Sequence, residues 1–331
     1  MKPPGAKASG EDDLIARYFR PLATDPGAFG LIDDAAILKS SGDDLVVTTD
    51  AIVEGVHFLP NDPPDTIARK ALRVNLSDLA AKGATPAGFV LTLVLREVRD
   101  EWLAPFATAL GEDAASFQCA LLGGDTVSTP GQLMISVTAF GRVPAGKMIH
   151  RSGAKPDDKI AVTGTIGDAT LGLRLLKGNL TGDGLDDAAY DSLVRRYRVP
   201  QPRNAIAMAV RNHASAAMDV SDGLAGDLAK LCAASGVSAA IDASSIPLSN
   251  AARKLLDVGQ VDFEDIVSGG DDYEILSAIP ENRWASFAAE VARAGVAVTC
   301  IGSVAAGSGV PMFAGQDGKP VVLKRLSYSH F

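Results

Sequence analysis

The chain has little cysteine, no long apolar run and no excess of positive charge, and each shortage excludes a class of protein. Its three cysteines lie far apart in apolar stretches, without the spacing of a disulfide framework or a metal motif, which fits a reducing cytosol. No run is long and apolar enough to span a membrane. The N-terminus also lacks the apolar segment of a signal peptide. We therefore expect a cytoplasmic protein that does not contact a membrane.

Positive charge is outnumbered, with 31 Lys and Arg against 40 Asp and Glu and a formal net charge of -9. This balance argues against a nucleic-acid partner, which needs a basic surface. It suits a phosphate-binding protein only if bound metal ions reverse the local charge. The glycine-bearing string VTGTIGD at 162–168 lacks the GK[ST] ending of a Walker A loop. No Ser-His-Asp or Cys-His arrangement suggests covalent catalysis.

Apolar residues make up 47% of the 331 residues, enough for two domains with proper cores. Helical and strand patterns alternate with short Gly- or Pro-marked connections, which indicates an α/β protein with mixed α+β sheets. The Gly-, Lys- and Pro-containing stretch at 144–158 is the best boundary. We predict two α/β domains that face each other across a cleft, residues 1–147 and 148–331.

The local patterns place several elements. Residues 45–49 and 216–220 read as strands, residues 66–82 as a helix, and residues 119–122 as a short buried strand. The GGDT string after that short strand reads as a turn. That turn either has no function or is a place where two small residues let a ligand approach the backbone.

Aspartates recur where these apolar runs end. A single aspartate in a turn is often a helix N-cap, but a cap has no reason to recur at every strand end. Strand ends in α/β proteins open onto ligand crevices, and carboxylates gathered there repel one another unless cations lie between them. The pattern therefore predicts several Mg²⁺ ions and a phosphorylated ligand. The aspartates are Asp33, Asp34, Asp50, Asp78, Asp125, Asp219, Asp222 and Asp271.

Three further features are candidates for ligand contacts. The string DVSDGL offers two carboxylates three residues apart, the Ser221 hydroxyl, and Gly223 at a helix N-terminus suited to an anion. Arg151 is a candidate phosphate clamp because a guanidinium binds two oxygens at once, although a surface arginine in a linker is an equally good reading. His57 is either a structural histidine or a ligand contact.

Taken in order, the strings VNLSDLAAKGATP, LLGGDT, HRSGAK and DVSDGL resemble thiamine-monophosphate kinase, in the superfamily of aminoimidazole ribonucleotide synthetase and selenophosphate synthetase. The resemblance covers nearly the whole chain. It implies transfer of the γ-phosphate of ATP, a co-substrate, to thiamine monophosphate with the help of Mg²⁺. It also implies an N-terminal α/β domain that pairs in a homodimer, and a C-terminal α/β domain.

The resemblance also implies roles for individual residues. The implied metal ligands are Asp33, Thr48, Thr49, Asp50, Asp78, Asp125, Asp219 and Asp222. The implied ATP contacts are Gly124, Asp125, Arg151 and Ser221. The implied substrate contacts are His57, Asp271 and Tyr328, where Asp271 stands in the string GGDDYE and the family commonly has GGEDYE.

Two alternatives remain open. One is another ATP-using member of the superfamily, similar to aminoimidazole ribonucleotide synthetase. The other is a protein that binds Mg²⁺ and nucleotide without turnover.

Overall fold

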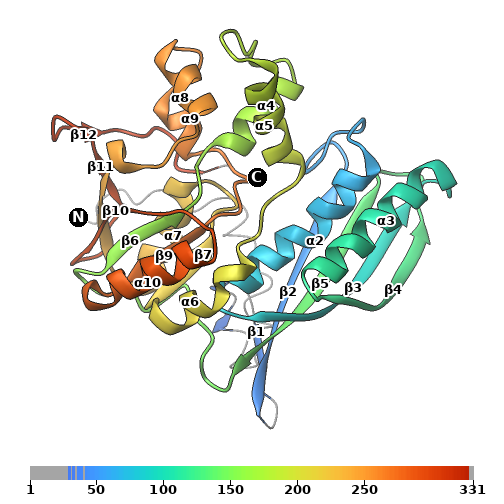
Figure 1. Cartoon of the computed structure of the whole chain (residues 1–331), viewed down its shortest axis with the longest axis horizontal. Helices are drawn as coiled ribbons and strands as arrows, with labels where there is room; N and C mark the ends of the chain where they lie inside the picture. Colours follow the sequence, from blue (N-terminus) through green and yellow to red (C-terminus); the bar gives the residue numbers. More distant parts are fainter. Residues whose placement is uncertain (1–28, 31, 34–35, 40–41, 328–331) are drawn as a thin grey trace, which may run out of the picture.

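The computed structural model describes residues 29–30, 32–33, 36–39 and 42–327. These residues form two β-sheets, one from residues 36–144 and one from residues 159–321. In Figure 1 the first sheet lies to the right and the second to the left. Tyr328, a predicted substrate contact, lies outside the described residues. Among the described helices, none has the length and apolar character needed to cross a membrane.

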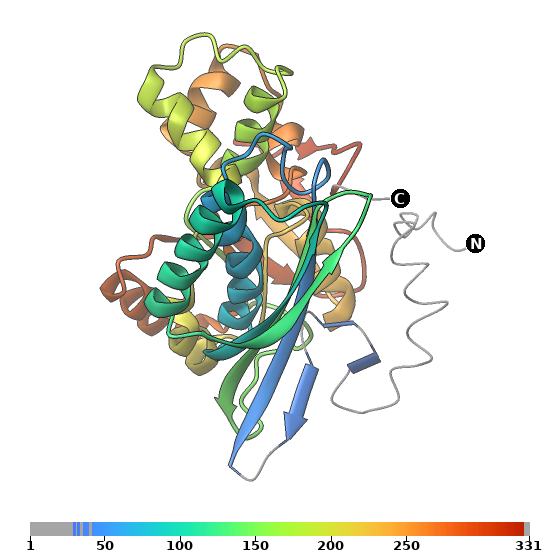
Figure 2. The same ribbon diagram turned by 90° about the vertical axis from the view of Figure 1, so that its right-hand side faces the viewer.

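The first sheet has the strand order β1-β2-β5-β3-β4. All its neighbours are antiparallel except β3 and β4, which are parallel. Helices α2 and α3 cover one face of the sheet (Figure 2). The elements are β1 (Ala36–Lys39), β2 (Asp43–Val53), α2 (Pro64–Ala81), β3 (Thr85–Leu95), α3 (Asp100–Ser116), β4 (Ala120–Ser128) and β5 (Met134–Pro144).

Alternation along β2 assigns its residues to the two faces of this sheet. Val46, Thr48 and Ile52 are buried on the face that α2 covers, whereas Thr49 and Ala51 are exposed on the opposite face. Asp50 has the same parity as Thr48 and therefore points toward the helical side. The sequence pattern predicts that the strand ends at Asp50. The strand instead continues to Val53, so Asp50 lies within it.

The second sheet has the order β12-β11-β8-β10-β6-β9-β7, with β11 and β8 the parallel pair. Its strands are β6 (Lys159–Thr163), β7 (Ala216–Asp219), β8 (Ser238–Asp242), β9 (Ile275–Ile279), β10 (Val298–Ala305), β11 (Met312–Ala314) and β12 (Pro320–Val321). Its helices are α4 (Asp168–Leu176), α5 (Asp187–Arg198), η4 (Asn204–Ile206), α6 (Ala207–His213), α7 (Leu224–Ser235), η5 (Ala243–Ser245), α8 (Asn250–Asp257), α9 (Phe263–Val267) and α10 (Glu281–Arg293).

Helix α2 joins the two sheets. Ile67, Leu72 and Leu76 pack into the core of the first sheet. Ala80 and Ala81, at the end of the same helix, pack into a cluster with η4, α6, α10 and strands of the second sheet. The residues between these contacts are therefore placed where the two halves of the chain meet (Figure 1).

Strand β4 differs from the prediction. The GGDT string is not a turn but part of a nine-residue strand whose residues are all exposed, so the short strand predicted at 119–122 is longer and, apart from Cys119, not buried. A Cβ on Gly124 would lie 1.9 Å from the Leu91 carbonyl oxygen. Glycine thus permits the close parallel pairing of β4 with β3, a reason that the string alone did not distinguish from ligand approach.

Candidate active site

A cavity of about 370 Å³ lies where elements of both sheets meet. Strand β2 contributes Asp50, the following loop contributes His57, and the segment after β7 contributes Ser221 and Asp222. The segment before β9 contributes Asp271. Helix α4, Val74 of α2 and Arg325 also line the cavity. One cavity therefore brings together residues predicted to bind metal, ATP and substrate.

Three carboxylates in or beside this cavity have pKa values above the ordinary range of an aspartate. Desolvation among the surrounding groups, and then the charge of Asp222, raise the pKa of Asp50 to about 6, although the Asp50 residue is exposed and lines the cavity. Burial, and then Asp219 and Asp50, raise the pKa of Asp78 well above its ordinary value. Burial also raises the pKa of Asp219 to about 6, with Asp227 and Asp50 adding to it. These mutual effects show that the side chains lie close together.

Tyr273 lies among the same carboxylates. Burial raises the pKa of its phenol well above the ordinary value, and the charges of Asp271, Asp50, Asp219 and Asp222 add to the shift. Its hydroxyl lies 3.3 Å from the Asp271 carboxylate and donates to it. Tyr273 therefore connects the acidic group with a predicted substrate contact.

Thr48 and Thr49, both predicted metal ligands, point to opposite sides of the first sheet. The Thr48 hydroxyl donates to Asp78 Oδ2 at 2.5 Å. The Thr49 hydroxyl lies 3.2 Å from the Val137 carbonyl oxygen and 2.9 Å from the Thr138 hydroxyl. Within this chain the structure brings Thr48, but not Thr49, to the acidic group.

Asp125 and Gly124 lie on β4, away from the cavity. Asp125 pairs with Thr92, Thr92 with Ser136, and Ser136 with Ala51. Three inter-strand spacings of about 4.8 Å therefore separate Asp125 from β2, about 14 Å in all. Because paired residues share a face, Asp125 lies with Ala51 on the face opposite Asp50.

Asp33 is held in an ion pair. Its Oδ1 lies 2.6 Å from Lys82 Nζ, and its Oδ2 accepts the Arg151 backbone N–H at 3.0 Å. Burial opposes ionisation, but the Lys82 charge and the hydrogen bonds from His150, Lys82 and Arg151 outweigh it and hold the Asp33 pKa well below its ordinary value. Lys82 also lowers the pKa of Asp78 and Asp219, so Asp33 is linked to the acidic group through this ammonium.

The anion site predicted at Gly223, before the start of α7, stays a prediction, and two backbone N–H groups just ahead of it are already occupied. The backbone N–H groups of Ser221 and Asp222 donate to the buried Asp227 carboxylate at 3.0 and 2.9 Å. Lys230 pairs with Asp222 and lies 3.2 Å from Asp227. The cationic groups here, Lys230 and the nearby Arg151 whose charge lowers the pKa of Asp227, are the features of this segment suited to phosphate.

The donor set fits Mg²⁺ ions that share their coordination with phosphate. Carboxylate and hydroxyl oxygens are the hard ligands Mg²⁺ prefers, and the mutually raised pKa values of Asp50, Asp78 and Asp219 mark a place where a cation is favoured. Among the described residues, no three His, Cys, Asp or Glu side chains converge tightly enough to hold one ion. Mg²⁺ commonly takes one or two carboxylates and completes its shell with phosphate and water.

The two described substrate candidates line the cavity from different halves of the chain. His57 Nδ1 accepts the Val53 N–H at 3.0 Å, which places the proton of a neutral imidazole on Nε2. Asp271 has φ 72, its N–H donates to the Ser221 carbonyl at 2.8 Å, and its Oδ2 pairs with Lys70 at 2.9 Å.

Sequence reasoning missed the residues that support these groups. They are Lys70, Lys82, Asp227, Lys230 and Tyr273. Asp227 carried a local signal, because an acidic residue in the first turn of a helix suits the helix dipole. The two lysines of the α2 region carried none, since most lysines remain exposed.

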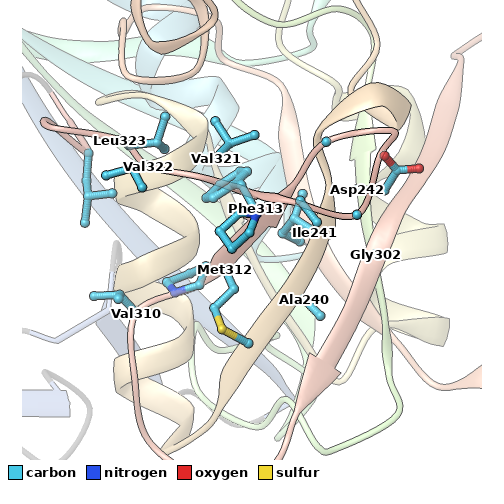
Figure 3. Close-up of a pocket in the computed structure, with 16 residues that line it drawn as sticks. Ala240, Ile241, Asp242, Gly302, Val310, Met312, Phe313, Val321, Val322 and Leu323 are labelled. Atoms are coloured by element: carbon cyan, nitrogen blue, oxygen red, sulfur yellow. The ribbon is translucent and has the colours of Figure 1, made fainter.

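A larger cavity, of about 660 Å³, lies beside strands β8, β11 and β12 of the second sheet, and shares no lining residue with the first. Figure 3 shows its apolar wall, with Phe313 and Ile241 beside Met312. Asp242 is the charged residue that lines it. Such a surface offers no set of donors for a phosphorylated ligand, so the smaller, polar cavity is the candidate active site.

Two family models match the chain. "AIR synthase related protein, N-terminal domain" matches residues 32–143, and "AIR synthase related protein, C-terminal domain" matches residues 155–313. The two matches correspond to the two sheets. They support a mixed α/β protein built from an N-terminal and a C-terminal unit of this superfamily.

Several characterised relatives share nearly the full length. The thiamine-monophosphate kinase of Caulobacter vibrioides is 45% identical and the match covers 99% of this chain and 92% of that protein. The Escherichia coli K12 enzyme of the same name is 40% identical, with 98% and 99% covered. Among solved structures, AaThiL complexed with AMPPCP and TMP has a TM-score of 0.79 and 30% identity over 92% of this chain and 97% of that one. Thiamine-monophosphate kinase from Stenotrophomonas maltophilia has a TM-score of 0.77 and 38% identity over 96% and 98%.

Proposed function

The chain belongs to the thiamine-monophosphate kinase family of AIR synthase related proteins, and we propose that it transfers the γ-phosphate of ATP to thiamine monophosphate, giving thiamine diphosphate and ADP. The observation that carries this proposal is the cavity that Asp50 and Asp222 line together with His57 and Asp271. Carboxylates suited to metal-bound phosphates and side chains assigned to the organic substrate share one site. The complex of AaThiL with AMPPCP, an ATP analogue, and TMP supports it.

The main obstacle to this reaction is repulsion between two polyanions. The acceptor is a phosphate oxygen that is already ionised at neutral pH, so the reaction needs no strong general base. Each pair of unit charges about 4 Å apart costs roughly 4 kcal/mol at an effective dielectric constant near 20. The enzyme would therefore accelerate the reaction by positioning the donor and acceptor phosphates and by neutralising their charge.

Asp33, Thr48, Asp50, Asp78, Asp219 and Asp222 are the residues of the chain that would hold Mg²⁺ around the cavity. Bound Mg²⁺ supplies charge neutralisation on the donor and acceptor phosphates. The chain adds its own cations: Arg151 and Lys230 lie beside Asp222 and Asp227. We assign Arg151 and Ser221 to ATP, as the family resemblance implies.

The thiamine end of the acceptor is assigned to His57 and Asp271. Thiamine carries a thiazolium cation and an aminopyrimidine ring, so a carboxylate and an imidazole N–H donor complement it. Asp271 is 25% exposed and lines the cavity opposite the His57 loop. Tyr328 remains a predicted substrate contact.

We also propose that a second copy of the chain covers the open face of the first sheet. Strand β4 is an edge strand that exposes Leu121, Leu122 and Val127, with 53%, 63% and 41% of each accessible. Exposed apolar residues on an edge strand are a site of pairing with another chain. Thr49 and Asp125 lie on this open face, and Gly124 precedes Asp125 on the same edge strand, so a dimer formed there lets these residues act in a site shared between subunits.

A direct assay tests the function. We expect the purified protein with ATP, Mg²⁺ and thiamine monophosphate to form equal amounts of thiamine diphosphate and ADP, resolved by separating the thiamine esters. A chelator should abolish both products, and added Mg²⁺ should restore them. Nucleotide binding without ADP would support a non-catalytic role, and ADP formed only with another phosphorylated acceptor would assign a different superfamily activity.

A further inference from the structure

Lys70, on α2, is a buried cation that does not face the active-site cavity. Its side chain is 2% exposed, and it is not among the residues that line the cavity. Burying an ammonium group is unfavourable unless it is paired. The structure pairs it with Asp271 Oδ2 at 2.9 Å, across the junction between the two halves of the chain. Lys70 therefore acts on the site through the residue it holds.

Asp271 needs such support because its backbone is strained. A φ of 72 places a residue with a side chain in the left-handed region that favours glycine. Two contacts besides Lys70 hold it: its N–H donates to Ser221, and its Oδ1 accepts the Tyr273 hydroxyl at 3.3 Å. Lys70 is the cation of this set, and it fixes the carboxylate oxygen that Tyr273 does not contact.

The same ammonium is linked to His57. Lys70 Nζ lies 3.9 Å from the centre of the Tyr197 ring, a cation–π contact. Tyr197 is 1% exposed, and its hydroxyl donates to the His57 carbonyl oxygen at 3.3 Å. The next residue of α5, Arg198, donates to Asp62 at 2.6 Å. Asp62 lies in the same loop as His57, between β2 and α2, so this contact fixes the loop near its second end.

We propose that Lys70 is a positioning residue that fixes the spacing between Asp271 and His57 and thereby sets the affinity for the thiamine end of the acceptor. This inference rests on the proposed function. Lys70 holds Asp271 directly and holds His57 through Tyr197, so one buried charge orients two substrate contacts that arise from different halves of the chain. Its link to Ser221, which is assigned to ATP, runs through the Asp271 backbone N–H, so we expect ATP binding to depend on Lys70 much less than thiamine-monophosphate binding does.

The test compares Lys70→Met with Arg69→Met. Lys70→Met removes the charge but keeps the length of the side chain, and we expect the KM for thiamine monophosphate to rise about tenfold while the KM for ATP changes less than twofold. Calorimetric binding of thiamine monophosphate without ATP should weaken by a similar factor. Arg69→Met removes an ion pair with Glu112 and Asp113 from the neighbouring position of the same helix, and it should leave both KM values unchanged.

Two milder variants cover the case in which Lys70→Met does not fold. Tyr197→Phe removes only the hydroxyl and should raise the thiamine-monophosphate KM about threefold. Lys70→Arg keeps the charge but moves it, and should raise the same KM by a smaller factor than Lys70→Met does. If the KM values of folded variants are unchanged, or if the KM for ATP rises equally, the proposed role of Lys70 is wrong while the proposed kinase function still stands. A wild-type protein that forms no thiamine diphosphate would overturn the proposed kinase together with this inference.

Discussion

Several aspartates around the cavity are less acidic than ordinary carboxyl groups because each lies in the field of others. Asp219 is buried, with 3% of the residue exposed and a pKa raised to about 6. Asp50 has the same raised value for the same reasons, burial and a neighbouring carboxylate. At neutral pH the metal-free protein therefore holds ionised groups in a place that disfavours them, and a bound cation relieves this cost.

This arrangement predicts the pH dependence of stability. A carboxyl whose pKa rises on folding binds more protons in the folded state, so its contribution to stability falls as pH rises from about 4 to about 6. In chelator, we expect wild-type protein to unfold at a higher temperature at pH 5 than at pH 7. Asp219 alone should account for about 1 kcal/mol, or about 2 °C. The depressed Asp33 carboxyl stays ionised throughout this window and does not contribute to the trend.

Asp219→Asn is the matched control for that measurement. The amide keeps the shape of the side chain and does not titrate, so the difference between pH 5 and pH 7 should shrink. Saturating Mg²⁺ should raise the unfolding temperature of wild-type protein more at pH 7 than at pH 5, because protons and Mg²⁺ compete for the same oxygens. Equal pH trends in the two proteins would contradict the assignment.

At the scale of elements, α2 determines the arrangement of the site. It carries Lys70 and Asp78, and Lys82 follows its last residue. Lys82 is fully buried; its ammonium pairs with Asp33 and donates to the Ala217 carbonyl oxygen on β7 at 3.0 Å. The end of α2 thus places the Lys82 ammonium group among carboxylates from three segments.

We predict that Lys82→Met makes the protein more dependent on Mg²⁺. Without the ammonium, the buried Asp33 carboxylate loses its lysine partner and keeps its contacts with His150 and the Arg151 N–H. Removing one partner of a buried ion pair typically costs about 3–5 kcal/mol, so the metal-free protein should unfold at a clearly lower temperature. Added Mg²⁺ should then raise the unfolding temperature more than it does in wild type, as measured by thermal unfolding with and without chelator. Arg69→Met, which also loses an ion pair but far from these carboxylates, should show the wild-type response to Mg²⁺. An equal response in all three proteins would show that Lys82 does not offset the acidic charge.

The strongly periodic elements could be predicted from the sequence. The helix predicted at 66–82 is α2 at 64–81, and the strand predicted at 216–220 is β7 at 216–219. Both have a clear apolar pattern and recognisable ends, such as Gly83 with φ 68 after α2. The convergence of Asp50 and Asp222 on one cavity was also expected from their positions.

The rest depended on tertiary contacts that a local pattern does not contain. Strand β4 extends through Gly123 and Gly124 because β3 pairs with it, which no turn propensity could reveal. The grouping of Thr48 with Thr49 overlooked that adjacent residues of a strand face opposite sides. Lys70 is paired with Asp271, and Lys82 with Asp33 and the Ala217 carbonyl oxygen. These partners are distant in the sequence, so the neighbours of the two lysines gave no sign of their burial.

At the scale of the whole molecule, the two halves are tied together around α2, while one face of the first sheet remains open. Asp50 and Asp125 are both predicted metal ligands, yet they lie on opposite faces of that sheet. Within one chain they are separated by the sheet itself and by about 14 Å of strand spacings. If both serve one reaction, the open face must meet the cavity of another subunit.

Mixed dimers test this arrangement. We expect Asp50→Asn and Asp125→Asn to be folded and inactive when each is purified alone, because each removes one predicted ligand. Co-expressed with different affinity tags and purified through both, the two variants form heterodimers. If Asp125 acts across the interface, one of the two sites in each heterodimer has both aspartates, and about half of the wild-type activity should return. If both residues act within one chain, every site lacks one aspartate and the heterodimers remain inactive. Tandem-purified wild-type dimers carrying the same two tags provide the reference. An inactive Asp50→Asn/Asp125→Asn heterodimer would show that Asp125 does not complete the site of the other subunit.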